Sequence, residues 1–306
     1  MQSALTLTCL VFGLLSTSFA SPVLTSHAIS SSLYDDLVLY TKYSSAVYQW
    51  NCPSPLGNTL VRSFSVGDTQ GFIARDDDRK EIVVSFRGTS SLGNALTDVN
   101  IALVPFTSPG IAKSFNVHSG FLAAYNDVAD IVLTTVEAQV AKFPKYSVVV
   151  TGHSLGGALA ALGAVSVKTA LPSAALKLYT FGQPRTGDAQ WAAFAESTIG
   201  VNNIFRAVHT FGKQFHEMMI YIGLLDVFPT DGVPTMTPRI LGYKHHSTEY
   251  WQFEDPVLFT SGPTTVKKCA GKEDPSCSDS ILSTGINAAH LFYFGQAMAL
   301  NPSLCV

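Results

Sequence analysis

The sequence predicts an α/β fold in which a mostly parallel central sheet is covered by helices on both faces. Short apolar runs of strand length alternate with longer segments of helical periodicity through the middle of the chain, a pattern typical of parallel sheets. The chain has 306 residues, of which 47% are hydrophobic and 13% charged. That is enough apolar material for one large packed domain, and it excludes disorder.

The expected elements follow in chain order. Residues with a helical repeat of apolar side chains predict an opening helix, and two strands around the polar turn 75–79 predict a hairpin. A single long helix should end before Pro144, because proline cannot continue it. The ranges are helix Ser31–Gln49, strands Val66–Ile73 and Glu81–Phe86, helix Gly120–Phe143, strand Tyr146–Val150, a helix ending near Leu171, strand Leu176–Phe181, helix Ala189–Glu196 and strand Asn203–Val208. The stretch Ser91–Ser108 carries few clear signals.

The first residues, Met1–Ala20, predict a cleaved secretory signal. Their apolar run, Leu5 to Leu15, is too short to span a bilayer, and it is followed by the small-residue pattern Ser18-Phe19-Ala20. The mature domain would then comprise residues 21–306, and no later stretch reaches transmembrane length. We therefore expect a secreted, extracellular protein.

The cysteine content fits an oxidising compartment. Cys9 would leave with the signal, and the mature chain would keep Cys52, Cys269, Cys277 and Cys305, which allow three pairings. Cys269 and Cys277 flank a short loop, so a local bridge between them is natural, and Cys52 would then pair with Cys305.

Charge and spacing exclude several function classes. The net charge of −3 provides no basic patch for nucleic acid. No His, Cys and Asp cluster has the spacing of metal ligands, so neither a metal nor another cofactor is expected.

The segment Tyr146–Ala160 is the strongest functional motif. A valine-rich strand leads into Gly152-His153-Ser154-Leu155-Gly156, and a helix rich in alanine and leucine follows. Strand, Gly-x-Ser-x-Gly and helix together form the nucleophile elbow of α/β-hydrolases. Glycines remove the Cβ atoms that the tight turn would crowd, and the helix N-terminus favours an anion beside Ser154.

A serine nucleophile needs a histidine base and a carboxylate that orients it, in the chain order Ser, Asp, His. Two histidine regions lie far enough downstream, His245-His246 and His290. The residues alone leave both open.

Five segments of the chain resemble the secreted fungal class 3 lipases and the related feruloyl esterases. The resemblance extends from about Leu33 to Cys305 and implies the α/β-hydrolase fold. The segments are Glu81–Thr89, Thr151–Gly157, Tyr179–Arg185, Gly242-Tyr243 with Glu249–Trp251, and Ala289–Gly295.

The resemblance implies a role for particular residues. The base falls on His290, whereas His245 and His246 match a structural segment. The oxyanion hole falls on Thr89 and the N–H of Leu155. His118 and His153 are expected to pack or form hydrogen bonds. Both disulfide pairings inferred above are supported as well.

The acid lies where the chain departs from the family pattern. The family has a short join before Asp-Gly-Val-Pro, whereas here residues 212–230 intervene between Phe211 and Asp231. We assign the acid to Asp231. Asp226 is the weaker competitor, because Phe228 does not fit the expected Asp-Gly-Val-Pro.

The insert 212–230 is unusually apolar for a surface loop. One hypothesis is a retained intron, since Gly212-Lys213 is compatible with a donor sequence G-GT-AAG and Thr230-Asp231 with an acceptor ACA-G. The alternative is a genuine loop of this lineage. A transcript that always contains the insert would count against the intron.

The substrate class is predicted from the position of the family's lid. This position holds Ser91, Leu92, Asn94 and Leu96, a small apolar face without tryptophan. An acylglycerol ester at a lipid interface is the first choice and a small-molecule aryl ester, such as a feruloyl ester, the second. A catalytically inactive lipid-binding homologue is the alternative if the insert disrupts the acid. We expect a monomer that contacts lipid surfaces transiently.

Overall fold

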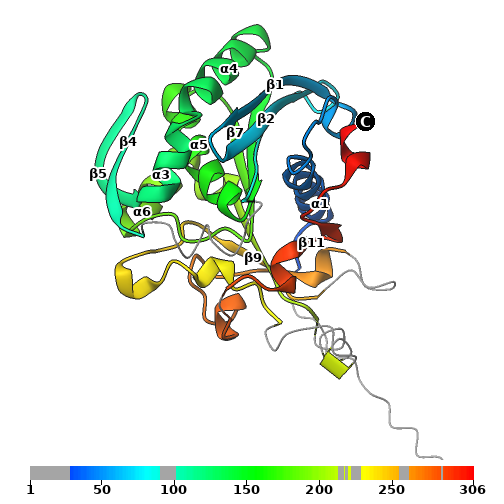
Figure 1. The fold of residues 1–306 in the computed structure, drawn as a ribbon. Helices are drawn as coiled ribbons and strands as arrows, with labels where there is room; N and C mark the ends of the chain where they lie inside the picture. Colours follow the sequence, from blue (N-terminus) through cyan, green and yellow to red (C-terminus); the bar gives the residue numbers. More distant parts are fainter. Residues whose placement is uncertain are drawn as a thin grey trace, which may run out of the picture.

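The computed structural model describes residues 28–89, 101–212, 217, 220–221, 229–254, 262–283 and 285–306 (Figure 1). Within these residues one large sheet has the strand order β1-β2-β3-β6-β7-β8-β9-β10. Its strands are β1 (Thr59–Val66), β2 (Thr69–Asp76), β3 (Glu81–Phe86), β6 (Ser147–His153), β7 (Leu176–Phe181), β8 (Ile204–His209), β9 (Glu249–Gln252) and β10 (Val266–Lys268).

The centre of this sheet is parallel and its two edges are antiparallel. Pairs β3–β6, β6–β7, β7–β8 and β8–β9 are parallel. Pairs β1–β2, β2–β3 and β9–β10 are antiparallel. The carboxyl ends of the parallel strands therefore meet at one edge, where α/β folds place their ligands.

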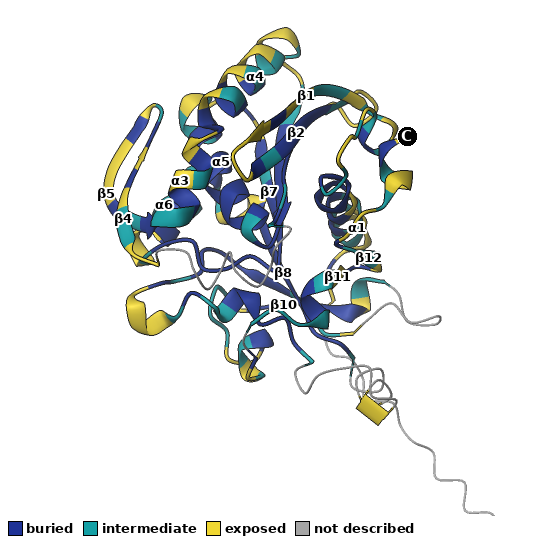
Figure 2. Cartoon of the chain, viewed as in Figure 1, coloured by how far each residue is buried: buried dark blue, intermediate teal, exposed yellow. Residues whose placement is uncertain are grey.

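Helices cover both faces of the sheet, as predicted (Figure 1). One apolar core lies beneath α3 (Ser119–Asn126), α4 (Ala129–Lys142), α5 (Leu155–Ala170) and α6 (Ala189–Ile199). A second core lies on the opposite face, beneath α1 (Ser31–Ala46) and the C-terminal segments. The inner strands and α5 are buried, whereas the outer side of α4 faces solvent (Figure 2).

Short elements complete the described part of the chain. They are η1 (Pro55–Gly57), β4 (Leu103–Ser108), β5 (Ile111–His118), η2 (Val201–Asn203), η3 (Val233–Thr235), η4 (Arg239–Leu241), η5 (Pro263–Thr265), η6 (Ser278–Ser280), η7 (Ala288–Leu291), β11 (Phe292–Tyr293), β12 (Gln296–Ala297) and η8 (Pro302–Cys305). The end of the stretch in which the sequence carried few signals forms β4, which pairs with β5 in a hairpin.

Two predicted elements were wrong in their extent. The strand expected over Val66–Ile73 is interrupted by the turn at Gly67 and Asp68, which separates β1 from β2. The helix expected over Gly120–Phe143 is broken at Asp127 and Val128 into α3 and α4. Val128 is fully buried at this break, so the chain turns there to bury the apolar faces of both helices.

The structure contains both disulfides, Cys52–Cys305 and Cys269–Cys277. None of the helices that the structure describes is long and apolar enough to cross a membrane. The secretory signal 1–20, the lid residues Ser91, Leu92, Asn94 and Leu96, and Asp226 lie outside the described residues.

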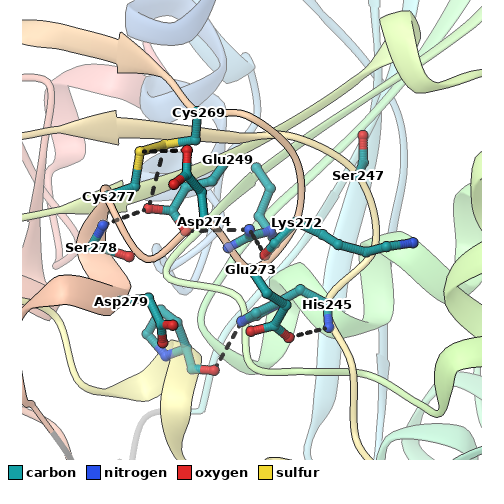
Figure 3. A network of polar contacts seen from close by, with 12 residues as sticks. His245, Ser247, Glu249, Cys269, Lys272, Glu273, Asp274, Cys277, Ser278 and Asp279 are labelled. Carbon is teal, nitrogen blue, oxygen red and sulfur yellow. Dashed lines mark hydrogen bonds and ion pairs between the residues drawn. A yellow bond between two sulfur atoms is a disulfide. The ribbon is translucent and has the colours of Figure 1, made fainter.

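A polar network holds the loops that follow β8 and β10. Arg185, from the Gln-Pro-Arg segment after β7, pairs with both carboxylate oxygens of Glu273 at 3.0 and 3.1 Å. The same guanidinium donates to the carbonyl oxygen of Thr237 at 3.0 Å. Figure 3 shows Glu273 beside His245, whose backbone N–H donates to its carboxylate at 3.0 Å. Because Thr237 follows Asp231 closely, this network anchors the acid loop.

Candidate active site

Ser154 lies on a strained turn between β6 and α5. Its backbone has φ 60° and ψ −129°, a conformation that L residues rarely adopt. A Cβ on Gly152 would lie 2.2 Å from the carbonyl oxygen of Gly156, and one on Gly156 would lie 2.3 Å from that of Phe86. Only glycine fits at either position, which is why the motif requires both.

The turn aims Ser154 at the carboxyl edge of the sheet. Its N–H donates to the carbonyl oxygen of Phe181 at the end of β7, at 2.9 Å. Leu155 is the first residue of α5, so the positive end of that helix and the Leu155 N–H lie beside the serine. The side chain of Ser154 is fully buried.

His290 and Asp231 lie together at the same edge. His290 Nδ1 contacts Asp231 Oδ2 at 2.9 Å, and both side chains are buried, with exposed fractions of 0% and 1%. Since a carboxylate only accepts, Nδ1 carries the proton and Nε2 is left as the basic nitrogen. Gly182 allows this approach, because a Cβ there would lie 2.5 Å from Asp231 Oδ2.

The carboxylate of Asp231 is held from three sides. Its Oδ1 accepts the N–H of Val233 at 2.9 Å, and its Oδ2 accepts both His290 and the hydroxyl of Tyr293, the latter at 2.5 Å. Burial by itself raises the pKa of Asp231, but the His290 charge and these hydrogen bonds outweigh it and lower the pKa. The acid is therefore ionised at neutral pH.

The ends of the insert meet beside the acid. The N–H of Phe211 donates to the carbonyl oxygen of Pro229 at 2.8 Å, and Thr210 bridges Thr230. The N–H of Asp231 donates to the carbonyl oxygen of His209 at 2.9 Å. The two ends of the insert therefore lie side by side. Asp231, although it follows the insert in sequence, lies next to the end of β8.

The buried polar atoms at this edge that lack hydrogen-bond partners among the described residues include Ser154 Oγ and His290 Nε2. Unpaired buried polar atoms are costly and uncommon in folded proteins. These two are the hydroxyl and the ring nitrogen between which a serine–histidine mechanism transfers a proton.

The rival histidines have structural contacts. His245 Nε2 contacts the carbonyl oxygen of Pro234 at 3.0 Å, and His246 Nε2 contacts Gln183 at 2.9 Å. Burial, together with nearby arginines, lowers the pKa of His245 well below its usual value and that of His246 to about 3. His118 caps α3, where its Nδ1 accepts the N–H groups of Gly120 and Phe121.

The proposed oxyanion residues lie on two sides of Ser154. Leu155 follows it, and Gly88 packs so close that a Cβ there would lie 3.2 Å from the Ser154 Cβ. Thr89, half-buried, is the next residue after Gly88. The end of β3 thus runs alongside the nucleophile, as an oxyanion donor requires.

Sequence reasoning missed two tyrosines. Tyr293 donates to the acid, and Tyr48 contacts His153 Nδ1 through its hydroxyl at 2.8 Å. Tyr293 follows His290 by three positions within a segment already singled out for its resemblance. No sequence motif marks either tyrosine, so their contacts could not be predicted without the folded structure.

Glu249 lies beside two cysteine sulfurs, within 4.8 Å of both Cys269 and Cys277. Those sulfurs are bonded to each other, so neither is a thiolate that could bind a metal. The Glu249 carboxylate instead accepts from Arg206 at 3.3 Å. It also accepts from the N–H of Ser278 at 3.1 Å (Figure 3).

Comparison with known proteins shows which family the chain resembles. The family model of the class 3 lipases matches residues 83–211. A lipase of Rhizomucor miehei is 32% identical over 91% of this chain and 72% of its own length. A secreted mono- and diacylglycerol lipase of Fusarium solani is 32% identical over 81% of this chain and 68% of its own length.

A solved triacylglycerol lipase structure, described as having a serine protease triad at its catalytic centre, aligns with a TM-score of 0.71 and 30% identity. The alignment covers 91% of this chain and 99% of that one. The fold, the elbow and these similarities lead to one conclusion: the chain belongs to the class 3 lipase family of α/β-hydrolases.

Proposed function

We propose that this chain is a lipase that hydrolyses acylglycerol esters with Ser154 as nucleophile, His290 as base and Asp231 as the orienting acid. The observation that carries the proposal is the buried Asp231–His290 pair beside the strained Ser154 turn, with Ser154 Oγ and His290 Nε2 unpaired among the described groups. The family to which the chain belongs supports the same chemistry.

The reaction proceeds through an acyl-enzyme. His290 Nε2 accepts the proton of Ser154 as Oγ attacks the ester carbonyl carbon, and the Leu155 N–H and Thr89 stabilise the oxyanion. The C–O bond to the alcohol breaks as the imidazolium returns the proton to the leaving oxygen. Water then attacks the acyl-enzyme by the same route, and the fatty acid leaves. Asp231 stabilises the imidazolium throughout.

The proposed substrate class rests on the relatives, which include mono-, di- and triacylglycerol lipases. Ser154 is fully buried, so some part of the chain must move before an ester of either class reaches its hydroxyl. The names of the relatives support transient contact with a lipid surface and secretion. Action as a monomer stays a prediction from the sequence. An aryl ester, such as a feruloyl ester, is the second candidate.

The first test measures hydrolysis of emulsified triacylglycerol and of soluble methyl ferulate by the purified chain, with Ser154→Ala as the blank. We expect turnover of the emulsion to exceed that of the ferulate. Preference for the ferulate would move the assignment to the aryl esterases. No turnover above the blank on either substrate would contradict the assignment of the chain as an enzyme and would favour an inactive lipid-binding protein.

The acid is tested by a matched pair of substitutions. Asp231→Asn should lower kcat by roughly a thousandfold, because the amide no longer holds His290 in the required tautomer. Asp226→Asn, the competitor within the insert, should leave kcat unchanged. The opposite result would transfer the acid to Asp226.

A further inference from the structure

A largely buried chain of polar contacts connects the three segments of the proposed active site. The hydroxyl of Tyr48 packs against Gly88, where an added Cβ would lie 2.2 Å from it, and contacts His153 Nδ1 at 2.8 Å. On its other side, His153 Nε2 contacts the carbonyl oxygen of His290 at 2.7 Å. Gly88 precedes Thr89, and His153 precedes Ser154. These contacts therefore link the segments that hold the proposed oxyanion residue, the nucleophile and the base, His290.

The acceptors determine the direction of these hydrogen bonds. A carbonyl oxygen cannot donate, so His153 Nε2 carries the proton and donates to His290. The neutral ring then has Nδ1 free to accept, and the Tyr48 hydroxyl donates to it. Every polar atom of the Tyr48 and His153 side chains is thereby used, which is the condition for a buried polar network to add rigidity.

The base needs such support because of its local structure. His290 lies on η7, a short 3₁₀ segment, and its own N–H reaches only Asn287, whose carbonyl oxygen lies at 3.1 Å. Two buried histidines hold this segment to the sheet: His153 through the carbonyl of His290, and His209, whose Nδ1 donates to the carbonyl of Ala289 at 2.9 Å. His153 directly precedes Ser154 in the sequence, whereas His290, whose carbonyl oxygen it contacts, is 137 positions away.

We propose that Tyr48 and His153 are positioning residues, which set the distance between Ser154 Oγ and His290 Nε2 by bridging the end of β3, the nucleophile turn and the backbone of the base. This inference rests on the proposed function of the triad and adds two residues to it. Productive proton transfer tolerates only a few tenths of an ångström of displacement, so loss of the bridge should slow chemistry rather than weaken binding.

The neutrality of His153 is part of the arrangement. Its ring lies with its centroid 4.3 Å from that of His290 and is fully buried. Burial, and then the nearby charge of His290, lower the pKa of His153 well below its usual value. His153 therefore remains uncharged when His290 becomes an imidazolium, and the bridge holds throughout the reaction without repelling the base.

The test compares four single variants and one double variant in the full chain, with a soluble short-chain ester so that adsorption to a lipid surface does not affect the rates. Tyr48→Phe removes one hydroxyl, His153→Leu removes both ring nitrogens, and His153→Gln restores an N–H donor near the position of Nε2. His118→Ala is the matched control, a buried histidine that caps α3 and whose ring contacts Phe121 and Tyr243. The thermal midpoint is measured for each variant beside kcat and KM.

The expected result is a fall in kcat of about 100-fold for His153→Leu and about 10-fold for Tyr48→Phe, with KM unchanged. His153→Gln should recover most of kcat, and the double variant Tyr48→Phe/His153→Leu should be no slower than His153→Leu, because both act through one bridge. His118→Ala should lower the thermal midpoint and leave kcat unchanged.

The outcomes separate this inference from the proposed function. An active wild type whose Tyr48→Phe and His153→Leu variants keep full kcat would overturn the inference alone, as would a loss confined to KM or no recovery with glutamine. A wild type no faster than Ser154→Ala would instead overturn the proposed function. If His153→Leu fails to fold, Tyr48→Phe and His153→Gln decide the result.

Discussion

One oxygen of the acid, Asp231 Oδ2, accepts hydrogen bonds from both His290 and Tyr293. The carboxylate therefore has a fixed orientation before any substrate arrives. Preorganised groups cost no reorganisation when charge develops, and this is the largest electrostatic contribution an enzyme makes. The burial of Tyr293 keeps the hydroxyl directed at the acid and raises the pKa of Tyr293 well above its usual value.

The residue-scale prediction concerns this hydroxyl. Tyr293→Phe should lower kcat by about 10-fold with little change in KM, because it removes a charge-assisted hydrogen bond to the acid. The pKa of Asp231 should rise. Tyr43→Phe is the control, since it removes a half-buried hydrogen bond from Asn58 to a tyrosine hydroxyl in the same apolar core, away from the acid. Equal kcat values in the two variants would exclude a role for Tyr293 in positioning the acid.

At the scale of elements, the two ends of the insert meet at the end of β8. The hydrogen bond from the Asp231 N–H to the His209 carbonyl spans it. If residues 212–230 are removed, Asp231 becomes the third residue after His209, and the same hydrogen bond closes an ordinary β-turn. Thr230 also contributes, because its carbonyl accepts from Ser283 and Asn287 at 2.6 and 2.7 Å.

Two deletions of equal length test the insert. Removal of 212–230 keeps Phe211, and removal of 211–229 keeps Thr230. Both should retain kcat within about 10-fold, since each preserves the turn that presents Asp231. The residue before Asp231 supplies a backbone carbonyl for Ser283 and Asn287 in either deletion, so the first, which keeps the buried ring of Phe211, should be the more stable by about 2 kcal/mol. Measurements are kcat on a soluble ester and unfolding by urea. Two folded but inactive deletions would show that the insert belongs to the working site.

For the whole molecule, the long-range disulfide ties the first helical region to the C-terminus. Cys52–Cys305 has a sequence separation of 253. Replacement of both cysteines by serine should lower the free energy of unfolding by about 2–5 kcal/mol, because the unfolded chain regains the entropy of a very long loop. The short-range pair Cys269–Cys277 should cost less. Urea denaturation of the two double variants compares them, and equal losses would contradict the loop-length account.

Acid stability is also a property of the whole molecule. Burial lowers the pKa of His118 to about 4, and the pKa of His246 is about 3. In the unfolded chain both titrate near 6.5. Between these pKa values the unfolded state binds more protons than the folded state. The contribution of these histidines to stability is therefore complete above pH 6.5 and falls as the pH drops toward their folded-state pKa values. Asp231, with a lowered pKa, adds stability above about pH 4 that is lost below it.

The expected slope is up to about 1.4 kcal/mol per pH unit for each buried histidine. His118→Asn keeps a side-chain acceptor at the cap of α3 but removes the titrating ring. Its free energy of unfolding, measured by urea from pH 7 to 4, should fall less steeply than that of the wild type. Parallel curves would show that His118 does not contribute to the acid sensitivity.

The sequence by itself determined the layers of the fold and predicted Ser154 as the nucleophile. Periodicity of apolar residues is a local property, so most strands and helices could be predicted, and the glycines around Ser154 report the steric crowding of one short turn. Resemblance to a family extended this to His290, Asp231 and both disulfide pairings. The break between α3 and α4 could not be predicted, because it depends on what Val128 packs against.

Only the tertiary structure decided how residues remote in sequence meet. That Asp231 still reaches His290 despite the insert follows from the pairing of Phe211 with Pro229, which no local pattern predicts. The parts played by Tyr48, His153 and Tyr293 likewise depend on directional hydrogen bonds between distant segments. Hydrophobic burial is non-directional and can be read from composition and period, whereas a hydrogen bond exists only when the folded chain brings donor and acceptor into contact.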